Sequence, residues 1–342
     1  MLKRNRFLDV LKGIALILII LTHYSFTDDK RLLYAFPYWV DMGVPIFMII
    51  TGFVTAKSYE RKGIDSLDEA YKPEYTVRSM LRFLIPFIMI FIVEIFVMLR
   101  SNGFSGMPGI GMLAQGFLLG GNGPGAYYVP IMIQLVFVFP LIHRLVRLYR
   151  FNGVVITWLI TALCEMCRMA FQMTQATYCN LIFRYLPIVA YGIWLASEEY
   201  RPRPTLAVTG MIIGIGFIYA VSYRGYIPRI FNEWSGTSAM ACLYIMPIIG
   251  FFIKKCENAH FAPLELLGRA SFNIFLVQKV WYYLWRQVFQ TDGIGEHVIA
   301  RRLGATYVVC IAAGLVFWLI ESRITRKLTD IIIPWIRKKA GA

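Results

Sequence analysis

The sequence predicts an all-α, polytopic integral membrane protein with about ten transmembrane helices and both termini in the cytoplasm. Three observations lead to this fold class. Hydrophobic residues make up 58% of the 342 residues, and the mean hydropathy is +0.59. The apolar residues fall in runs long enough to cross a bilayer, and most Lys and Arg residues lie between these runs. Because no soluble domain is left over, we expect residues 1–342 to form a single membrane domain.

The first predicted span, residues 7–26, follows a basic start of the chain. This arrangement resembles a signal peptide, but no small-residue cleavage site follows His23, so we expect the segment to be retained. The second span, 36–56, is separated from the third by the longest polar insertion, residues 57–78. We expect this insertion on the cytoplasmic side, as an amphipathic segment broken near Pro73.

The remaining spans follow from apolar runs of roughly 20 residues, the length that a membrane helix needs. They are residues 81–99, 127–146, 153–171, 180–197, 205–223, 237–253, 264–289 and 303–321, which with the first two make ten spans. An even number of spans places both termini on one side. About 24 of the 35 Lys and Arg residues fall near that side, which predicts a cytoplasmic location for it.

Two further segments do not fit a simple span. Residues 108–125 are apolar but short, and they end in a glycine-rich stretch. They are either re-entrant, in which case they border a cavity, or an outer surface loop. Residues 324–342 mix basic and apolar side chains, which favours an amphipathic helix lying on an anionic membrane surface.

Other readings of the composition are weaker. The net charge of +15 is typical of nucleic-acid binding, but the basic residues lie between apolar runs, so membrane topology explains them and we expect no nucleic acid. The six cysteines are scattered and lack the spacing of a disulfide framework. Cys164 and Cys167 form a C-x-x-C pair on an apolar helix, where packing is the expected role. We expect no metal.

The most informative residue is His23, which lies in an apolar segment eleven residues after Lys12. At 3.6 residues per turn both side chains fall on one helix face, roughly 16 Å apart along the axis. Asp9 lies three residues before Lys12, where it can pair with it. Snorkelling is the alternative for Lys12, and a hydrogen bond to another helix is the alternative for His23. A near-neutral pKa suits imidazole to general-base catalysis.

The third span opens with Arg78 and Arg82, four residues apart on one helix face. Paired guanidinium groups suit a phosphate or pyrophosphate ligand, although anchoring at the inner membrane surface is the alternative. Glu94 stands alone further along this span and is the candidate acid or orienting partner of His23. Glu165 and Arg168 are expected to form a structural pair. A phosphate-bearing donor held at the arginines, with its reactive end reaching His23, fits the length of an acyl-CoA.

A family resemblance supports this interpretation. The first span, with Asp9, Lys12-Gly13 and His23, resembles the Arg/Lys-x10-His signature of the membrane acyltransferase-3 family. Four later segments resemble the family's patterns in the same order: Gly43-Val44-Pro45 through Thr51-Gly52-Phe53, Arg78 with Arg82 to Pro86, Tyr127-Tyr128-Val129-Pro130 with Gln134 and Pro140, and Leu267-Gly268-Arg269-Ala270-Ser271-Phe272-Asn273-Ile274-Phe275-Leu276.

The resemblance implies a multi-pass enzyme of the plasma (inner) membrane. It would transfer an acyl group, most often acetyl, from cytoplasmic acyl-CoA to an extracytoplasmic carbohydrate of a polysaccharide, cell wall or lipid-linked glycan. His23 would be catalytic, with Glu94 beside it. Lys12, Arg78 and Arg82 would bind the donor. The expected substrate-binding residues are Tyr127, Tyr128, Gln134, Ser271 and Gln278.

Three departures from the family pattern stand out. Gln278 occupies a position where many members have His, Lys12 replaces the commoner Arg, and three residues rather than two separate Arg78 from Arg82. The first departure points to an altered acceptor site. The rival function is a non-catalytic transporter or flippase of a glycan or acylated intermediate, because buried charges in many spans also describe a carrier. The sequence leaves open whether the protein forms a homo-oligomer.

Overall fold

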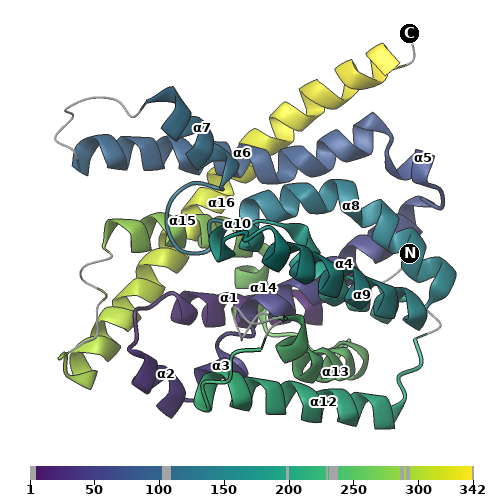
Figure 1. Ribbon diagram of the computed structural model, residues 1–342. Coiled ribbons are helices and arrows are strands. Elements are labelled where there is room, and N and C mark those ends of the chain that lie inside the picture. Colours follow the sequence, from purple (N-terminus) through teal and green to yellow (C-terminus); the bar gives the residue numbers. More distant parts are fainter. Residues whose placement is uncertain are drawn as a thin grey trace. The chain divides into compact units, whose positions relative to one another are not determined.

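The computed structural model describes residues 5–101, 109–197, 200–228, 230, 238–285, 289 and 293–340. The described residues form helices and no strand, in agreement with the predicted all-α class (Figure 1). The helices in chain order are α1 Phe7–Thr22, α2 Asp28–Leu33, α3 Phe36–Trp39, α4 Gly43–Lys62, α5 Leu67–Ala70, α6 Pro73–Ser101, α7 Ile110–Leu118, α8 Tyr128–Tyr149, α9 Phe151–Ala170, α10 Gln175–Cys179, the 3-10 turn Ile182–Tyr185, α11 Leu186–Ala196, α12 Pro204–Ile218 with the π-turn Tyr219–Tyr223, α13 Ala239–Lys255, α14 Ala262–Arg269, α15 Ser271–Leu284 and α16 Glu296–Ala340.

Six helical segments of the described chain are long and apolar enough to cross a membrane. They are Phe36–Lys62, Pro73–Arg100, Tyr128–Tyr149, Phe151–Ala170, Pro204–Tyr223 and Glu296–Lys339. Shorter helices occupy the other four predicted spans: α1, α11 and α13 in three of them, and two helices, α14 and α15, in the range 264–289. The prediction of a single span over 264–289 is therefore wrong, because the helix is interrupted at Ala270. Each predicted range therefore contains a helix, while the count of ten spans and the orientation of the termini stay predictions.

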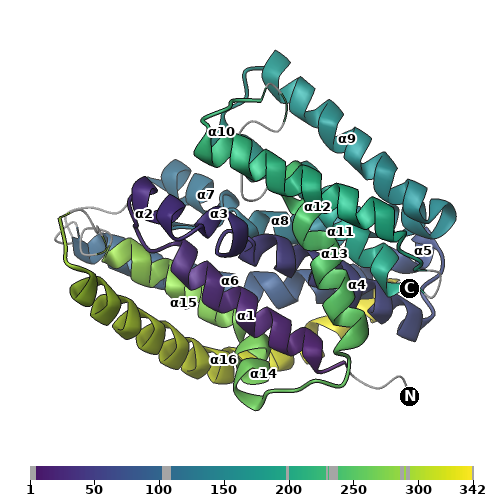
Figure 2. The ribbon, with the colours of Figure 1, turned by 90° about the horizontal axis from the view of Figure 1, so that it is seen from below.

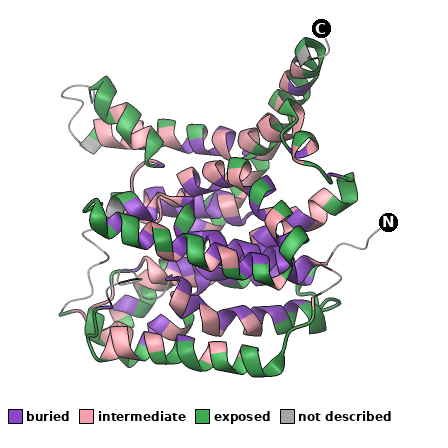
Figure 3. Cartoon of the chain, turned by 45° about the vertical axis from the view of Figure 1, so that its right-hand side comes forward, coloured by how far each residue is buried: buried purple, intermediate pink, exposed green. Residues whose placement is uncertain are grey.

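The side chains of these helices indicate an apolar solvent. Only 11% of the most apolar window in Pro204–Tyr223 is buried, and only 17% of that in Glu296–Lys339. In Figure 3 the end of α16 near the C label is also coloured mainly exposed or half-buried, but this end is basic, so its exposure suits water or a membrane surface. Helices that are hydrophobic and still exposed require lipid around them, because exposing such a large apolar surface to water is unfavourable.

Two of the predicted boundaries change. Residues 303–321 and 324–342 were expected as a span and a separate surface segment, but α16 is a single helix from Glu296 to Ala340. No Gly or Pro interrupts residues 315–333, so nothing in the chain ends the helix there. The polar insertion 57–78 is made of the end of α4, the short α5 and the start of α6 at Pro73, a position that suits proline at a helix start.

The described residues fall into two compact units, each of which is considered alone. The first consists of Met1–Thr22, Phe26–Leu67 and Phe139–Arg269. Within it, α1 and α14 lie side by side (Figure 2), and α12 lies beside α13 (Figure 1). Gly52 of α4 and Gly192 of α11 face the backbone of each other's helix, so that a Cβ at either position would collide with a carbonyl oxygen. Small residues of this kind allow close helix packing.

The second unit consists of His23–Ser25, Asp68–Val138 and Ala270–Ala342. Its helices α6, α15 and α16 pack on one another. Asn273 of α15 donates a hydrogen bond of 3.0 Å to the buried carboxylate of Glu321 on α16. Arg337 near the end of α16 pairs at 2.7 Å with Glu74 at the start of α6. These contacts hold α15 in place, and α15 builds most of the site described next.

Candidate active site

His23 directly follows the last residue of α1 and is half-buried. Its Nδ1 lies 2.5 Å from the side-chain amide nitrogen of Gln278 on α15. The edge of its ring faces Tyr282, with the ring centroids 6.2 Å apart and an interplanar angle of 76°. An imidazole held at one nitrogen and against an aromatic ring has a fixed orientation, which general-base catalysis requires.

The helix α15 presents these contacts because of its residue spacing. Phe275, Gln278 and Tyr282 are three and four residues apart, so they share one helix face. All three side chains are buried, Gln278 completely. Every position between Ser271 and Leu284 favours or tolerates a helix, since the segment contains neither Gly nor Pro. A regular helix therefore carries the residues that contact His23.

A glycine-rich loop, residues 120–125, forms another wall of the site. Gly120, Gly121, Gly123 and Gly125 have φ values of 85°, 87°, 96° and 79°, a region that only glycine adopts without strain. A Cβ at Gly125 would lie 3.0 Å from Cε1 of His23 and 2.8 Å from the ring of Phe275. The loop backbone thus lies against the imidazole, and a side chain would disturb it.

A buried ion pair holds this loop. The ammonium of Lys279 lies 2.8 Å from Oε1 of Glu94 on α6, and neither side chain is exposed to solvent. Lys279 also donates a hydrogen bond of 2.5 Å to the carbonyl of Gly120. The backbone N–H of Asn122 donates to Oε2 of Glu94 at 2.7 Å. Charges that are paired and hydrogen-bonded in this way tolerate burial.

Glu94, predicted as an acid or orienting partner of His23, has its described contacts with Lys279 and Asn122. The same unit thus brings His23, Glu94 and Gln278 to one region, because Gln278 and Lys279 are neighbours on α15. Whether Glu94 takes part in proton transfer stays a prediction.

Four of the residues predicted to bind substrate lie on or next to α8 or at the start of α15. Tyr128 at the start of α8 packs edge-on against Phe275, with the ring centroids 5.4 Å apart. The ring centroids of Tyr128 and Phe272 are 6.3 Å apart. Ser271, at the first position of α15, is buried. Tyr127 is half-buried just before α8, and Gln134 is half-buried within it. Tyr128 therefore borders the same Phe275 that contacts the glycine loop.

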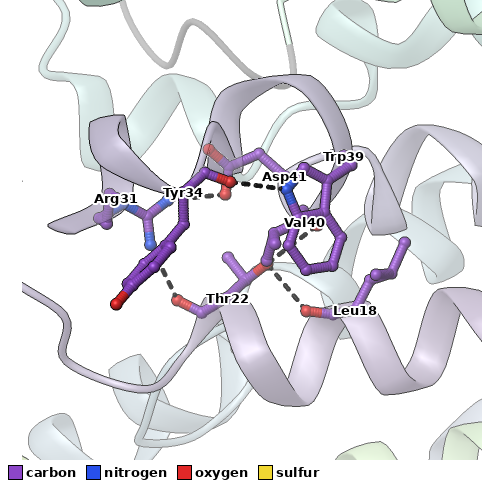
Figure 4. Close-up of polar contacts among 7 residues, drawn as sticks. All are labelled: Leu18, Thr22, Arg31, Tyr34, Trp39, Val40 and Asp41. Carbon is purple, nitrogen blue, oxygen red and sulfur yellow. Dashed lines mark hydrogen bonds and ion pairs between the residues drawn. The ribbon is translucent and has the colours of Figure 1, made fainter. Parts of the chain in front are cut away.

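The C-terminal end of α1 is fixed by a polar network, shown in Figure 4. Arg31 donates from one guanidinium nitrogen to the carbonyl of Thr22 at 3.4 Å and pairs through the other with Asp41 at 2.6 Å. The hydroxyl of Thr22 donates to the carbonyls of Leu18 at 3.0 Å and Val40 at 3.1 Å. The last carbonyls of a helix lack partners within the helix, and a cation there is favourable.

Two ion pairs expected from the sequence are present. Lys12 pairs with Asp9 at 3.6 Å, and Glu165 pairs with Arg168 at 3.6 Å.

The predicted donor residues lie on α1, which carries Lys12, and on α6. Arg78 and Arg82 are exposed on α6. Arg78 interacts electrostatically with Glu74, four residues earlier on the same helix. Their guanidinium groups are thus accessible to an anion. Arg82 and Glu94 lie on the same helix, about 18 Å apart at 1.5 Å per residue.

A family model described as an acyltransferase domain, that of the acyltransferase-3 family, matches residues 5–321. The chain belongs to the acyltransferase-3 family. The match covers α1 to α15 and most of the apolar part of α16, so it includes every candidate residue named above. Comparison with curated proteins and with solved structures finds no match. The protein is thus a membrane acyltransferase.

Sequence reasoning overlooked several residues of this acyltransferase. Lys279 and Tyr282 are not among the predicted site residues. Phe275 and Gly125 carried no functional prediction, although the glycine-rich stretch was expected to border a cavity if it was re-entrant. The run of glycines between two apolar segments was the signal that could have identified the loop.

Proposed function

We propose that this acyltransferase moves an acyl group, which we take to be acetyl, from cytoplasmic acyl-CoA to a hydroxyl of an extracytoplasmic carbohydrate, with His23 as the general base. The observation that carries the proposal is the placement of His23 against Gln278, in the same unit as Arg78 and Arg82. The separation of about 18 Å along α6 between Arg82 and Glu94 matches the reach of the pantetheine arm of coenzyme A.

The reaction that we propose needs one proton carrier. His23 removes the proton of the acceptor hydroxyl while the oxygen attacks the thioester carbonyl carbon. The tetrahedral intermediate collapses as the carbon–sulfur bond breaks, and the imidazolium returns the proton to the leaving thiolate. The products are the acyl ester and free coenzyme A. No oxidant, reductant or metal ion is required for this balance.

On the donor side, Arg78 and Arg82 would bind the phosphate groups, since guanidinium groups bind phosphate through paired hydrogen bonds. Lys12 would add positive charge, although its pairing with Asp9 neutralises part of it. In this proposal the arginine end of α6 faces the cytoplasm of a plasma (inner) membrane, as the distribution of basic residues predicts.

On the acceptor side, we place the carbohydrate against Tyr127 and Tyr128, whose rings suit stacking on a sugar face. Gln134 and Ser271 would supply hydrogen bonds. The glycine loop would allow the backbone to approach the acceptor or the thioester closely, because no side chain intervenes.

The alternative is a carrier that moves a glycan or an acylated intermediate without chemistry, and the buried pair Lys279–Glu94 is the kind of feature that carriers use. Purified protein in liposomes separates the two. Acetyl-CoA supplied outside, with a glycan acceptor inside, should release free CoA thiol and acylate the acceptor. Movement of the glycan without CoA release would support the carrier and contradict the proposed enzyme.

A further inference from the structure

Gln278 was expected to bind substrate, but its surroundings indicate a different task. The side chain is completely buried on α15, and its amide nitrogen lies 2.5 Å from Nδ1 of His23. A side chain enclosed by protein and in contact with the proposed base acts on a substrate through that base.

The ring atoms of His23 face different neighbours. Nδ1 faces Gln278, and Cε1 faces the backbone of Gly125, where even a methyl group would lie at 3.0 Å. Tyr282 lies against the ring from the same helix as Gln278. Because Nδ1 contacts Gln278 and Cε1 faces the loop backbone, we assign the proton transfer with the substrate hydroxyl to Nε2.

The amide of Gln278 decides where a neutral imidazole carries its proton. A glutamine amide offers a donor NH2 group and an acceptor oxygen, and a half turn about its last bond exchanges them. If the NH2 group faces Nδ1, this nitrogen accepts and Nε2 carries the proton. If the oxygen faces Nδ1, this nitrogen carries the proton and Nε2 has the lone pair that a base requires.

We propose that Gln278 is a positioning residue that holds His23 through Nδ1 with its amide oxygen during acyl transfer, so that Nε2 takes the proton of the acceptor. This inference rests on the proposed function. The same oxygen stabilises the imidazolium that forms, because the charged ring keeps its N–H at Nδ1. Since an amide does not ionise, the orientation of the base is the same at every physiological pH.

Several titratable groups surround His23 in the described part of the chain. Tyr282 of α15 contacts the ring, and Tyr24 is its neighbour in the chain. From α16, Arg302 interacts electrostatically with Tyr24, and Tyr307 and Cys310 interact with Tyr282. The glycine loop contributes no ionisable side chain, and behind it lies the Lys279–Glu94 pair. A carboxylate introduced at position 278 would lie in contact with Nδ1 of the imidazole, so its effect on the pH dependence of catalysis can be measured.

The test compares the wild type, Gln278→Met and Gln278→Glu in CoA release from acetyl-CoA across pH. For Gln278→Met we expect kcat to fall about tenfold or more with little change in KM for acetyl-CoA, because the base is no longer oriented. For Gln278→Glu we expect the acid limb of the profile to move to higher pH, because a carboxylate stabilises the imidazolium. Gln115→Met, on the exposed face of α7, is the matched control and should behave as the wild type.

A second measurement does not depend on turnover. Nitrogen NMR of protein labelled at histidine, with the His23 signal assigned by its loss in His23→Asn, should show Nδ1 protonated in the wild type and a changed tautomer in Gln278→Met. A wild-type ring protonated at Nε2, or Gln278 variants with unaltered kcat and pH profile, would overturn the inference. Absence of turnover with any acyl-CoA would instead overturn the proposed function, whatever the tautomer.

Discussion

The ammonium of Lys279 lies 2.8 Å from the carboxylate of Glu94, and solvent reaches neither group. Removing one partner of such a pair leaves the other charged and buried, which costs about 3–5 kcal/mol. We therefore expect Glu94→Gln to lower the melting temperature of the detergent-purified protein markedly, together with its activity. Size-exclusion chromatography of samples heated to increasing temperatures measures this change in melting temperature.

A double variant identifies the cause. Glu94→Gln combined with Lys279→Met removes both charges, and we expect it to recover most of the lost stability, since a pair replaced by uncharged side chains is often nearly neutral. If the single variant were as stable as the wild type but inactive, Glu94 would act in proton transfer, as the sequence predicted, rather than through the loop that it holds.

Gly125 tests whether the loop backbone must lie against His23. We expect Gly125→Ala to reduce kcat strongly, because φ is +79° there and the new methyl group would lie 3.0 Å from the imidazole. Gly216→Ala, in α12 with no atom within 4 Å of the new methyl group, is the control and should retain activity. Equal activity of the two variants would show that the loop position is unimportant.

The donor site on α6 can be tested by direct binding. Arg82→Ala should weaken the binding of coenzyme A by about tenfold, the loss expected for one charge-assisted hydrogen-bonding group. Isothermal titration with coenzyme A measures it. Arg100→Ala, an exposed arginine at the other end of the same helix, should bind as the wild type does. Unchanged affinity in Arg82→Ala would remove this arginine from the donor site.

The network at the end of α1 should also matter for catalysis. We expect Arg31→Gln to lower kcat, because the carbonyl of Thr22, the residue before His23, loses its cationic donor. Asp41→Asn should have a similar effect by releasing Arg31. A double-mutant cycle measures their coupling: the double variant should be little worse than either single one, and full additivity would argue against a shared role.

Local patterns in the sequence predicted much of this molecule. Hydropathy located a helix in each predicted range, and the spacing of Asp9 and Lys12 predicted a pair that the structure confirms. Both inferences depend on neighbours in the chain. The continuity of α16 was missed because a change from apolar to basic composition suggested a boundary, although composition alone does not end a helix.

The contacts that define the site could not be predicted in this way. Gln278 and His23 are 255 residues apart in the chain, and the partner of Glu94 lies on a different helix. No periodicity links such positions, since only the packing of α15 beside the glycine loop brings them together. The family pattern drew attention to position 278 but led to a prediction of substrate binding.

A labelling experiment decides whether His23 is the base for acyl transfer. Purified wild type, His23→Ala and His143→Ala, the last altering a histidine of α8, are incubated with acetyl-CoA labelled in the acetyl group and a glycan acceptor. We predict label in the acceptor with the wild type and His143→Ala, and none above background with His23→Ala when folding is intact. Transfer by His23→Ala at the wild-type rate would show that His23 is not the base.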